Sequence, residues 1–202
     1  MSHHTLLHRS LKPVVHGLAA IRVAPDQVTL LRLLTGLGSA VMLARGPEGL
    51  RTGAALFLVS ALLDRLDGAL ARRTGRFSRH GWRLDLIADC LSTMGFFIGL
   101  GLGIRAFLIP DLLPDMAAPW VSPALGLVAA CSIALLFRQH GRMQPEGDAG
   151  RVRPFDPDDV MLTLPVLLWF DQGGVVLLAA GTLSPLAAVS LWWLGRQRRL
   201  PA

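Results

Sequence analysis

The chain has 202 residues, of which 52% are hydrophobic and only 17% are charged, and its mean hydropathy is +0.48. A soluble domain carries nearer to a quarter of charged residues, so this composition argues against a water-soluble protein and favours a membrane protein. The formal net charge is +6. Because this charge accompanies a high apolar content, it indicates contact with a membrane surface, and binding of nucleic acid is not expected.

The first 26 residues differ from the apolar remainder. Between Thr5 and Ala20, leucines and valines occur among histidines and basic residues, a pattern typical of an amphipathic helix lying in the membrane interface. A tail without fixed structure is the alternative. We therefore expect three parts: an N-terminal cytoplasmic or interfacial segment at 1–26, a membrane domain at 27–195 and a basic cytoplasmic tail at 196–202.

Six apolar segments approach the roughly 20 residues with which a helix crosses a bilayer. They predict an all-α integral membrane bundle of six transmembrane helices, at Val28–Ala44, Thr52–Ala71, Trp82–Ile104, Val121–Phe137, Val160–Phe170 and Val175–Leu194. The fifth segment is the weakest, because Pro165 interrupts it. Gly173 and Gly174 predict a tight turn before the sixth.

The basic residues of the loops gather on one side of this arrangement. Only Arg45, Arg51 and Arg105 fall in loops of the other side. Since cytoplasmic loops carry the excess of lysine and arginine, both termini are expected in the cytoplasm. The sequence thus predicts a multi-pass protein of the inner (cytoplasmic) membrane.

Four aspartates interrupt the second and third segments: Asp64, Asp67, Asp85 and Asp89. A charged residue near the bilayer centre costs about 2.5–3.5 kcal/mol, so these four require neutralisation. Asp64 and Asp67 are three residues apart, and Asp85 and Asp89 are four apart, so each pair shares one helix face. With a rise of about 1.5 Å per residue, both pairs lie at similar depths from the loop that joins them, and we expect them to converge.

Carboxylates without histidine or cysteine are the ligands that Mg²⁺ or Mn²⁺ prefers. Two divalent ions would balance the four negative charges, so the sequence predicts a site for two metal ions. The alternative is a set of Asp–Arg ion pairs, for which several arginines lie close in sequence: Arg65, Arg72, Arg73 and Arg83.

The stretch from Asp64 to Asp89, DRLDGALARRTGRFSRHGWRLDLIAD, follows the pattern D-x-x-D-G-x-x-A-R-x8-G-x3-D-x3-D at every fixed position. Upstream, Pro25–Thr29 fits P-[ND]-x-x-T. Both stretches resemble motifs of the CDP-alcohol phosphatidyltransferase family, and the six-segment layout extends the resemblance over nearly the whole chain. The resemblance implies a homodimeric enzyme of phospholipid biosynthesis. Such an enzyme transfers the phosphatidyl group of CDP-diacylglycerol to the hydroxyl of a small alcohol and releases CMP.

The resemblance also implies roles for individual residues. Asp64, Asp67 and Asp85 would hold the two ions, and Asp89 would share one of them and take the proton of the acceptor hydroxyl. The residues expected to bind the CDP-linked substrate are Asp26, Gln27, Val28, Thr29, Gly68, Ala71, Arg72, Ser78 and Gly81. Close helix packing would equally explain the small residues among these, and anchoring at the membrane surface would equally explain the arginine.

The acceptor alcohol is less well specified. Arg138, Arg151 and Arg153, between the fourth and fifth segments, are candidates to bind a phosphorylated acceptor, and they are equally candidates for topology anchors. Glycerol 3-phosphate is the leading expectation, with inositol phosphate or serine as further choices. The acidic stretch Asp156–Asp159 fits either a contact with an ammonium group or a cap on the next helix.

Two other functions share these features. A phosphotransferase that moves phosphocholine or phosphoethanolamine from a CDP-alcohol to diacylglycerol would use the same motif. A divalent-cation transporter would also carry carboxylates in its spans, although all four aspartates here lie toward one membrane face rather than along a central path.

Overall fold

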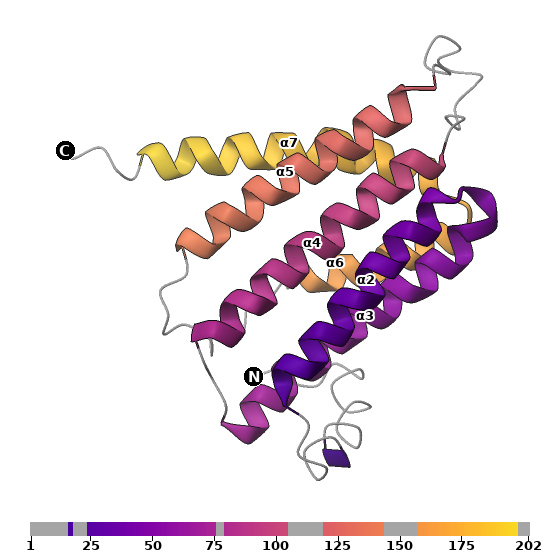
Figure 1. The fold of residues 1–202 in the computed structure, drawn as a ribbon. Coiled ribbons are helices and arrows are strands. Elements are labelled where there is room, and N and C mark those ends of the chain that lie inside the picture. The colour runs from indigo at the N-terminus through magenta and orange to yellow at the C-terminus, as the bar shows by residue number, and fades with distance from the viewer. Residues whose placement is uncertain (1–15, 18–23, 76–78, 105–118, 144–156, 198–202) are drawn as a thin grey trace.

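The computed structural model describes residues 16–17, 24–75, 79–104, 119–143 and 157–197. Within these ranges it contains six helices of 13 to 28 residues and no strand (Figure 1). The helices are α2 (Pro25–Ala44), α3 (Pro47–Thr74), α4 (Arg79–Gly103), α5 (Val121–Met143), α6 (Pro157–Trp169) and α7 (Gly173–Gln197). The predicted apolar segments are confirmed as helices. Of the predicted N-terminal helix, only His16 and Gly17 fall within the described residues, and both are helical and exposed.

Proline and glycine set several helix ends. Pro25 and Pro47 lie in the first turns of α2 and α3, where a backbone N–H has no partner within the helix. Gly75 ends α3 in the left-handed conformation, with φ of 63°. These residues therefore account for the starts of α2 and α3 and for the end of α3.

The turn between α6 and α7 differs from the prediction. The left-handed residue there is Asp171, with φ of 57°, whereas Gly173 and Gly174 are buried in the first turn of α7. A glycine turn was therefore the wrong interpretation. Aspartate tolerates the left-handed conformation because its short side chain forms local hydrogen bonds. Gly173 instead leaves space for the side chain of Ile104.

Four of the helices are long and apolar enough to cross a membrane, over Asp26–Ala44, His80–Gly103, Val121–Gln139 and Gly173–Leu194. Large apolar side chains are exposed on the outer faces of the bundle, such as Leu34 at 60% and Leu186 at 66%. Exposed apolar surface of this extent suits contact with lipid. The described part of the chain therefore has the features of a helical membrane protein. Four of its helices, rather than the six predicted, are both long enough and apolar enough to cross a membrane.

Helix α2 lies between the two helices that carry the aspartates. It packs along both α3 and α4, whereas α3 and α4 touch each other little (Figure 1). On the outside, α5 packs against α4, α7 against α5, and α6 against α3. The two motif helices are thus joined by α2 rather than packed together as a hairpin.

Glycines allow α2 and α4 to approach closely. A methyl group at Gly99 would overlap the backbone carbonyl oxygen of Ala40, and one at Gly103 would overlap that of Leu43. Small residues at such positions let two backbones approach, which matters in lipid because apolar burial adds little attraction between helices. The position of α2 therefore depends on glycines of α4.

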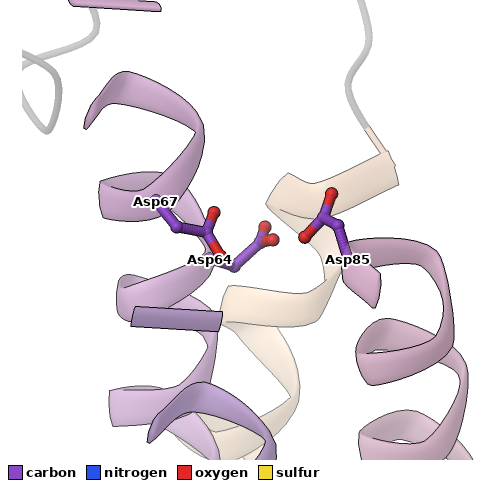
Figure 2. A group of neighbouring side chains, drawn as sticks. All are labelled: Asp64, Asp67 and Asp85. Carbon is purple, nitrogen blue, oxygen red and sulfur yellow. The ribbon is translucent and has the colours of Figure 1, made fainter. Parts of the chain in front are cut away.

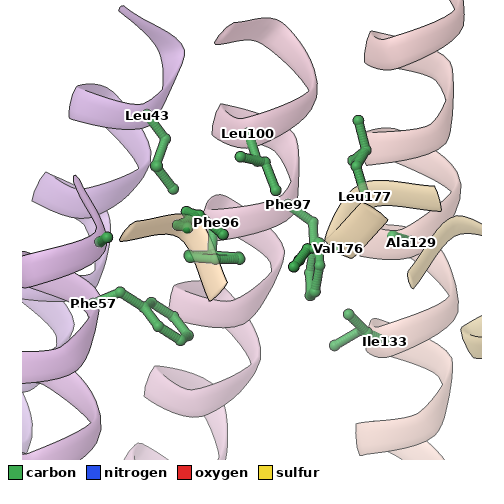
Figure 3. Close-up of a cluster of buried hydrophobic side chains, with 11 residues drawn as sticks. Leu43, Phe57, Phe96, Phe97, Leu100, Ala129, Ile133, Val176 and Leu177 are labelled. Atoms are coloured by element: carbon green, nitrogen blue, oxygen red, sulfur yellow. The ribbon is translucent and has the colours of Figure 1, made fainter. Parts of the chain in front are cut away.

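The apolar core lies about two helical turns from Asp64 and Asp89. The rings of Phe57 and Phe96 pack with their centroids 4.2 Å apart. The buried cluster draws its side chains from six helices: Leu43, Ala54, Phe57, Phe96, Phe97, Leu100, Ala129, Ile133, Leu168, Val176 and Leu177 (Figure 3). This core fixes the depth at which the polar residues of α2, α3 and α4 meet.

We expect Gly99→Ala to destabilise the protein, because the added methyl group meets backbone rather than a movable side chain. Overpacking typically costs about 1–3 kcal/mol, or roughly 3–10 °C in Tm for a chain of this size. Thermal unfolding in detergent measures the shift. Gly38→Ala is the matched control, since its methyl group would lie 3.6 Å from Leu56 Cδ1, an ordinary contact. Equal Tm values for the two variants would contradict the close α2–α4 contact.

Candidate functional site

Three of the four aspartates converge. Carboxylate oxygens of Asp64, Asp67 and Asp85 lie within 4.8 Å of one another. Figure 2 shows these three side chains pointing toward one another from α3 and α4. The predicted convergence of the two helix faces is thereby confirmed for this triad. Asp67 is the most deeply buried member, with a side chain 6% exposed, compared with 22% for Asp64 and 43% for Asp85.

Arg32 of α2 connects all four aspartates. It is 1% exposed. Its Nη1 forms ion pairs with Asp64, with Asp85 Oδ1 at 2.7 Å and with Asp67 Oδ2 at 3.7 Å. Its Nη2 lies 2.8 Å from Asp89 Oδ1. One guanidinium thus bridges α3 and α4 through the helix that lies between them.

The beginning of α2 supports the same cluster. The hydroxyl of Thr29 donates a hydrogen bond of 2.9 Å to Asp67 Oδ2, and both residues are buried. Next to it, Val28 is buried against Leu66 and Leu70 of α3. The P-[ND]-x-x-T element therefore holds a carboxylate of the triad in a fixed orientation, in addition to any contact with substrate.

A small cavity of about 30 Å³ lies on the inner side of the cluster, large enough for a water molecule. Its walls include Arg32, Asp64 and Asp89. One helical turn deeper, three hydroxyl side chains also line it, those of Ser60, Ser92 and Thr93. The apolar part of the wall comes from Phe57, Ala61 and Met161. Ser92 is 4% exposed, and its Oγ has no hydrogen-bond partner among the described residues. The polar region thus continues beneath the carboxylates.

The donor set fits a divalent metal ion. Three carboxylates offer oxygen ligands at close range, as Mg²⁺ or Mn²⁺ requires. Arg32 balances only one of the four negative charges, and buried charge is costly unless it is compensated. The alternative of Asp–Arg ion pairs also holds in part, through an arginine that was not considered from the sequence.

The positions of the other predicted substrate residues vary. Asp26 and Gln27 are exposed at the start of α2, where Gln27 Oε1 accepts a hydrogen bond of 3.1 Å from the backbone N–H of Ala24. Gly68, Ala71 and Gly81 are partly buried near the same end of the bundle. The side chain of Arg72 and all of Ser78 lie outside the described residues, as do Arg151 and Arg153. Arg138 is exposed on α5.

Arg32 is the functional residue that the sequence interpretation missed. The signal was present, because a lone arginine inside an apolar segment carries the same insertion cost as an aspartate. It also follows Thr29 by three residues and so shares its helix face. The arginines that the sequence suggested as partners were Arg65, Arg72, Arg73 and Arg83 instead.

The fold and the acidic cluster define a helical membrane protein with a candidate metal centre near one end of the bundle. A solved structure, the phosphatidylinositol phosphate synthase of Mycobacterium tuberculosis with CDP-DAG bound, has the same fold, with a TM-score of 0.62 and 22% identity over 92% of this chain and 94% of that one. The sequence profile of the CDP-alcohol phosphatidyltransferases matches residues 22–193. The chain belongs to the CDP-alcohol phosphatidyltransferase family.

Two curated relatives give closer sequence matches. The phosphatidylinositol phosphate synthase of Mycobacterium tuberculosis (strain H37Rv) is 37% identical over 93 residues, which cover 46% of this chain and 42% of the relative. The archaetidylinositol phosphate synthase of Methanothermobacter thermautotrophicus is 33% identical over 135 residues, covering 64% of this chain and 67% of the relative. The match thus spans less than half the length of the mycobacterial protein.

We expect a divalent cation to stabilise the purified protein. At a concentration about 100-fold above its Kd, Mn²⁺ should raise the Tm by roughly 5–10 °C over the value in EDTA. Asp64→Asn and Asp85→Asn should lose most of this gain, because each removes a carboxylate of the triad. Glu48→Gln, which changes an exposed acid at the opposite end of α3, is the control. The same Mn²⁺ gain in all four proteins would exclude the triad as the metal centre.

Proposed function

We propose that the protein transfers the phosphatidyl group of CDP-diacylglycerol to the hydroxyl of inositol phosphate and releases CMP. The observation that carries this proposal is the convergence of Asp64, Asp67 and Asp85 within a motif of the family. Asp89 stands outside that triad, and its side chain is 38% exposed. This arrangement supports separate roles for the triad and for Asp89.

In the proposed site, the triad binds Mg²⁺ or Mn²⁺, with two ions in all and Asp89 as a shared ligand of one. Such ions, when bound, stabilise the charge on the attacking and leaving oxygens of an in-line displacement. Around them, the start of α2 with Gly68, Ala71, Arg72, Ser78 and Gly81 binds the CDP group. Thr29 keeps Asp67 oriented through its hydrogen bond.

Asp89 is the proposed general base. Its carboxylate accepts the proton of the acceptor hydroxyl, whose oxygen forms a bond to the phosphorus that carries the diacylglycerol. The bond from that phosphorus to the CMP oxygen breaks, and the electron pair leaves with CMP. In the structure, Arg32 Nη2 lies 2.8 Å from Asp89 Oδ1.

Inositol phosphate replaces glycerol 3-phosphate as the leading acceptor. Both curated relatives are named as synthases of an inositol phosphate lipid, and so is the similar solved structure. The names differ in the lipid, which is phosphatidyl in the mycobacterial protein and archaetidyl in the archaeal one. Arg138 lies toward the end of α5 that returns to the side of the aspartates, and with Arg151 and Arg153 it remains the proposed contact for the acceptor phosphate.

The proposed topology has six spans, with both termini and the site on the cytoplasmic side of the inner membrane. Helix α3 has 28 residues, about 42 Å at 1.5 Å each. Two of its charged residues, Asp64 and Asp67, lie in the acidic triad. Helix α6 has 13 residues, about 20 Å, and would cross most of the apolar layer beside α3. The excess of basic residues in the loops of one side supports the orientation.

An acceptor screen tests the proposal. With CDP-diacylglycerol and Mg²⁺, inositol phosphate should give CMP and a lipid of matching mass, at a rate at least about tenfold above glycerol 3-phosphate, inositol or serine, because a site built for one alcohol leaves polar groups unpaired with another. Lipid mass spectrometry identifies the product. A higher rate with glycerol 3-phosphate would overturn the acceptor while leaving the family chemistry intact.

Asp89→Asn tests the base. Loss of a general base typically slows a reaction by about 10²–10⁴-fold, so CMP release should fall by at least about 100-fold. The Mn²⁺ stabilisation should fall less than in Asp64→Asn or Asp85→Asn, because Asp89 lies outside the triad and is the proposed ligand of only one of the two ions. Release of CMP at the wild-type rate would remove Asp89 from this role.

The two alternative functions predict different results. A phosphotransferase of the CDP-ethanolamine type would place label from radioactive CDP-ethanolamine into lipid, with diacylglycerol as acceptor. A cation transporter would move Mn²⁺ across vesicles and release no CMP with any alcohol. The position of the triad near one end of α3 and α4 argues against a path through the membrane.

A further inference from the structure

The contacts of Arg32 divide between its two terminal nitrogens. Nη1 meets all three carboxylates of the triad, those of Asp64, Asp67 and Asp85. Nη2 lies 2.8 Å from Asp89 Oδ1 and donates a hydrogen bond of 3.0 Å to the backbone carbonyl of Asp85. A divalent ion in the triad would bind the same three carboxylates that Nη1 contacts. Two cations at such short range repel each other.

A cavity next to Arg32 offers the guanidinium a second position. Its backbone is held firmly, because its carbonyl oxygen accepts hydrogen bonds from Ser60 Oγ at 2.9 Å and from Thr35 Oγ1 at 2.8 Å. Its side chain, by contrast, borders the cavity beneath the carboxylates. The buried Oγ of Ser92 lines that cavity and has no partner among the described residues. A hydroxyl oxygen there can accept an N–H from a displaced guanidinium.

We propose that Arg32 is an internal counter-ion that exchanges with the metal: Nη1 leaves the triad as a divalent ion enters, and the guanidinium moves into the cavity, where it donates to Ser92 Oγ. Arg32 thereby holds the four aspartates together before metal binding and weakens the affinity for the metal. This inference rests on the proposed metal centre at Asp64, Asp67 and Asp85.

A double-mutant cycle tests the exchange. The proteins are wild type, Arg32→Gln, Ser92→Ala and the double variant, and the measurements are Mn²⁺ affinity by electron paramagnetic resonance and Tm in EDTA. Arg32→Gln should bind Mn²⁺ at least about tenfold more tightly, since the competing cation is gone. Its Tm in EDTA should fall by roughly 5–15 °C, because the carboxylates lose their partner. Arg45→Gln, at the exposed far end of α2, should change neither quantity.

Ser92→Ala tests whether the guanidinium moves to Ser92, which Arg32→Gln alone does not test because it only removes the positive charge. It should weaken Mn²⁺ binding by about three- to tenfold when Arg32 is present, because the displaced guanidinium loses one hydrogen bond. In the Arg32→Gln background it should have no effect on Mn²⁺ affinity. If Arg32→Gln fails to fold in EDTA, Ser92→Ala still decides the question, because an unchanged Mn²⁺ affinity in that variant would overturn the exchange.

The outcomes distinguish the inference from the function on which it rests. If wild type binds Mn²⁺ through Asp64 but Arg32→Gln binds it equally or more weakly, the exchange is wrong and the metal centre stands. If Ser92→Ala has the same effect with and without Arg32, the cavity is not where the guanidinium goes. If wild type binds no Mn²⁺ at all, the proposed metal centre fails and the exchange fails with it.

Discussion

Four carboxylates that lie close together at one end of an apolar helical bundle repel one another, and the structure of the site follows from the need to offset this repulsion with positive charge. The aspartates come from two helices that touch each other little, so their mutual repulsion is not opposed by direct packing of α3 on α4. Helix α2 supplies both the missing packing and the positive charge. It fills the space between the two helices, and it brings the guanidinium of Arg32 to all four carboxylates.

The packing of α2 and the chemistry of the site are therefore linked. Glycines such as Gly99 let α2 approach α4 at the far end of the bundle, where the apolar core also lies. Nearer the aspartates, Ser60 and Ser92 lie close to Gly36 of α2 and line a small cavity whose walls are both polar and apolar. Close contacts at Gly36 and at Gly99 thus fix the three-helix unit, and the small cavity beside Arg32, Asp64 and Asp89 leaves room for charged groups to rearrange.

Much of this arrangement could be predicted from the sequence. Apolar segments of nearly membrane-spanning length predicted all six helices. The spacing of the four aspartates predicted that they would converge, which three of them do. The position of α2 between α3 and α4 could not be predicted, because α3 and α4 are neighbours in the chain and would be expected to pack as a hairpin. The packing of α2 on α4 depends on which glycines face which backbone, and the sequence alone does not show this. The turn at Asp171 was missed because the neighbouring glycines gave a stronger but misleading signal. The homodimer, the domain limits and the roles of the site residues stay predictions.

The central position of α2 has a consequence for building chimaeric proteins from relatives in this family. The side chains of Thr29 and Arg32 contact aspartates of α3 and α4. Exchanging α2 alone would bring in side chains fitted to another pair of helices. Exchanging α2, α3 and α4 together would keep each polar side chain with its partner. The remaining helices contact this unit from outside, so they can be exchanged while the ion pairs of Arg32 stay unchanged.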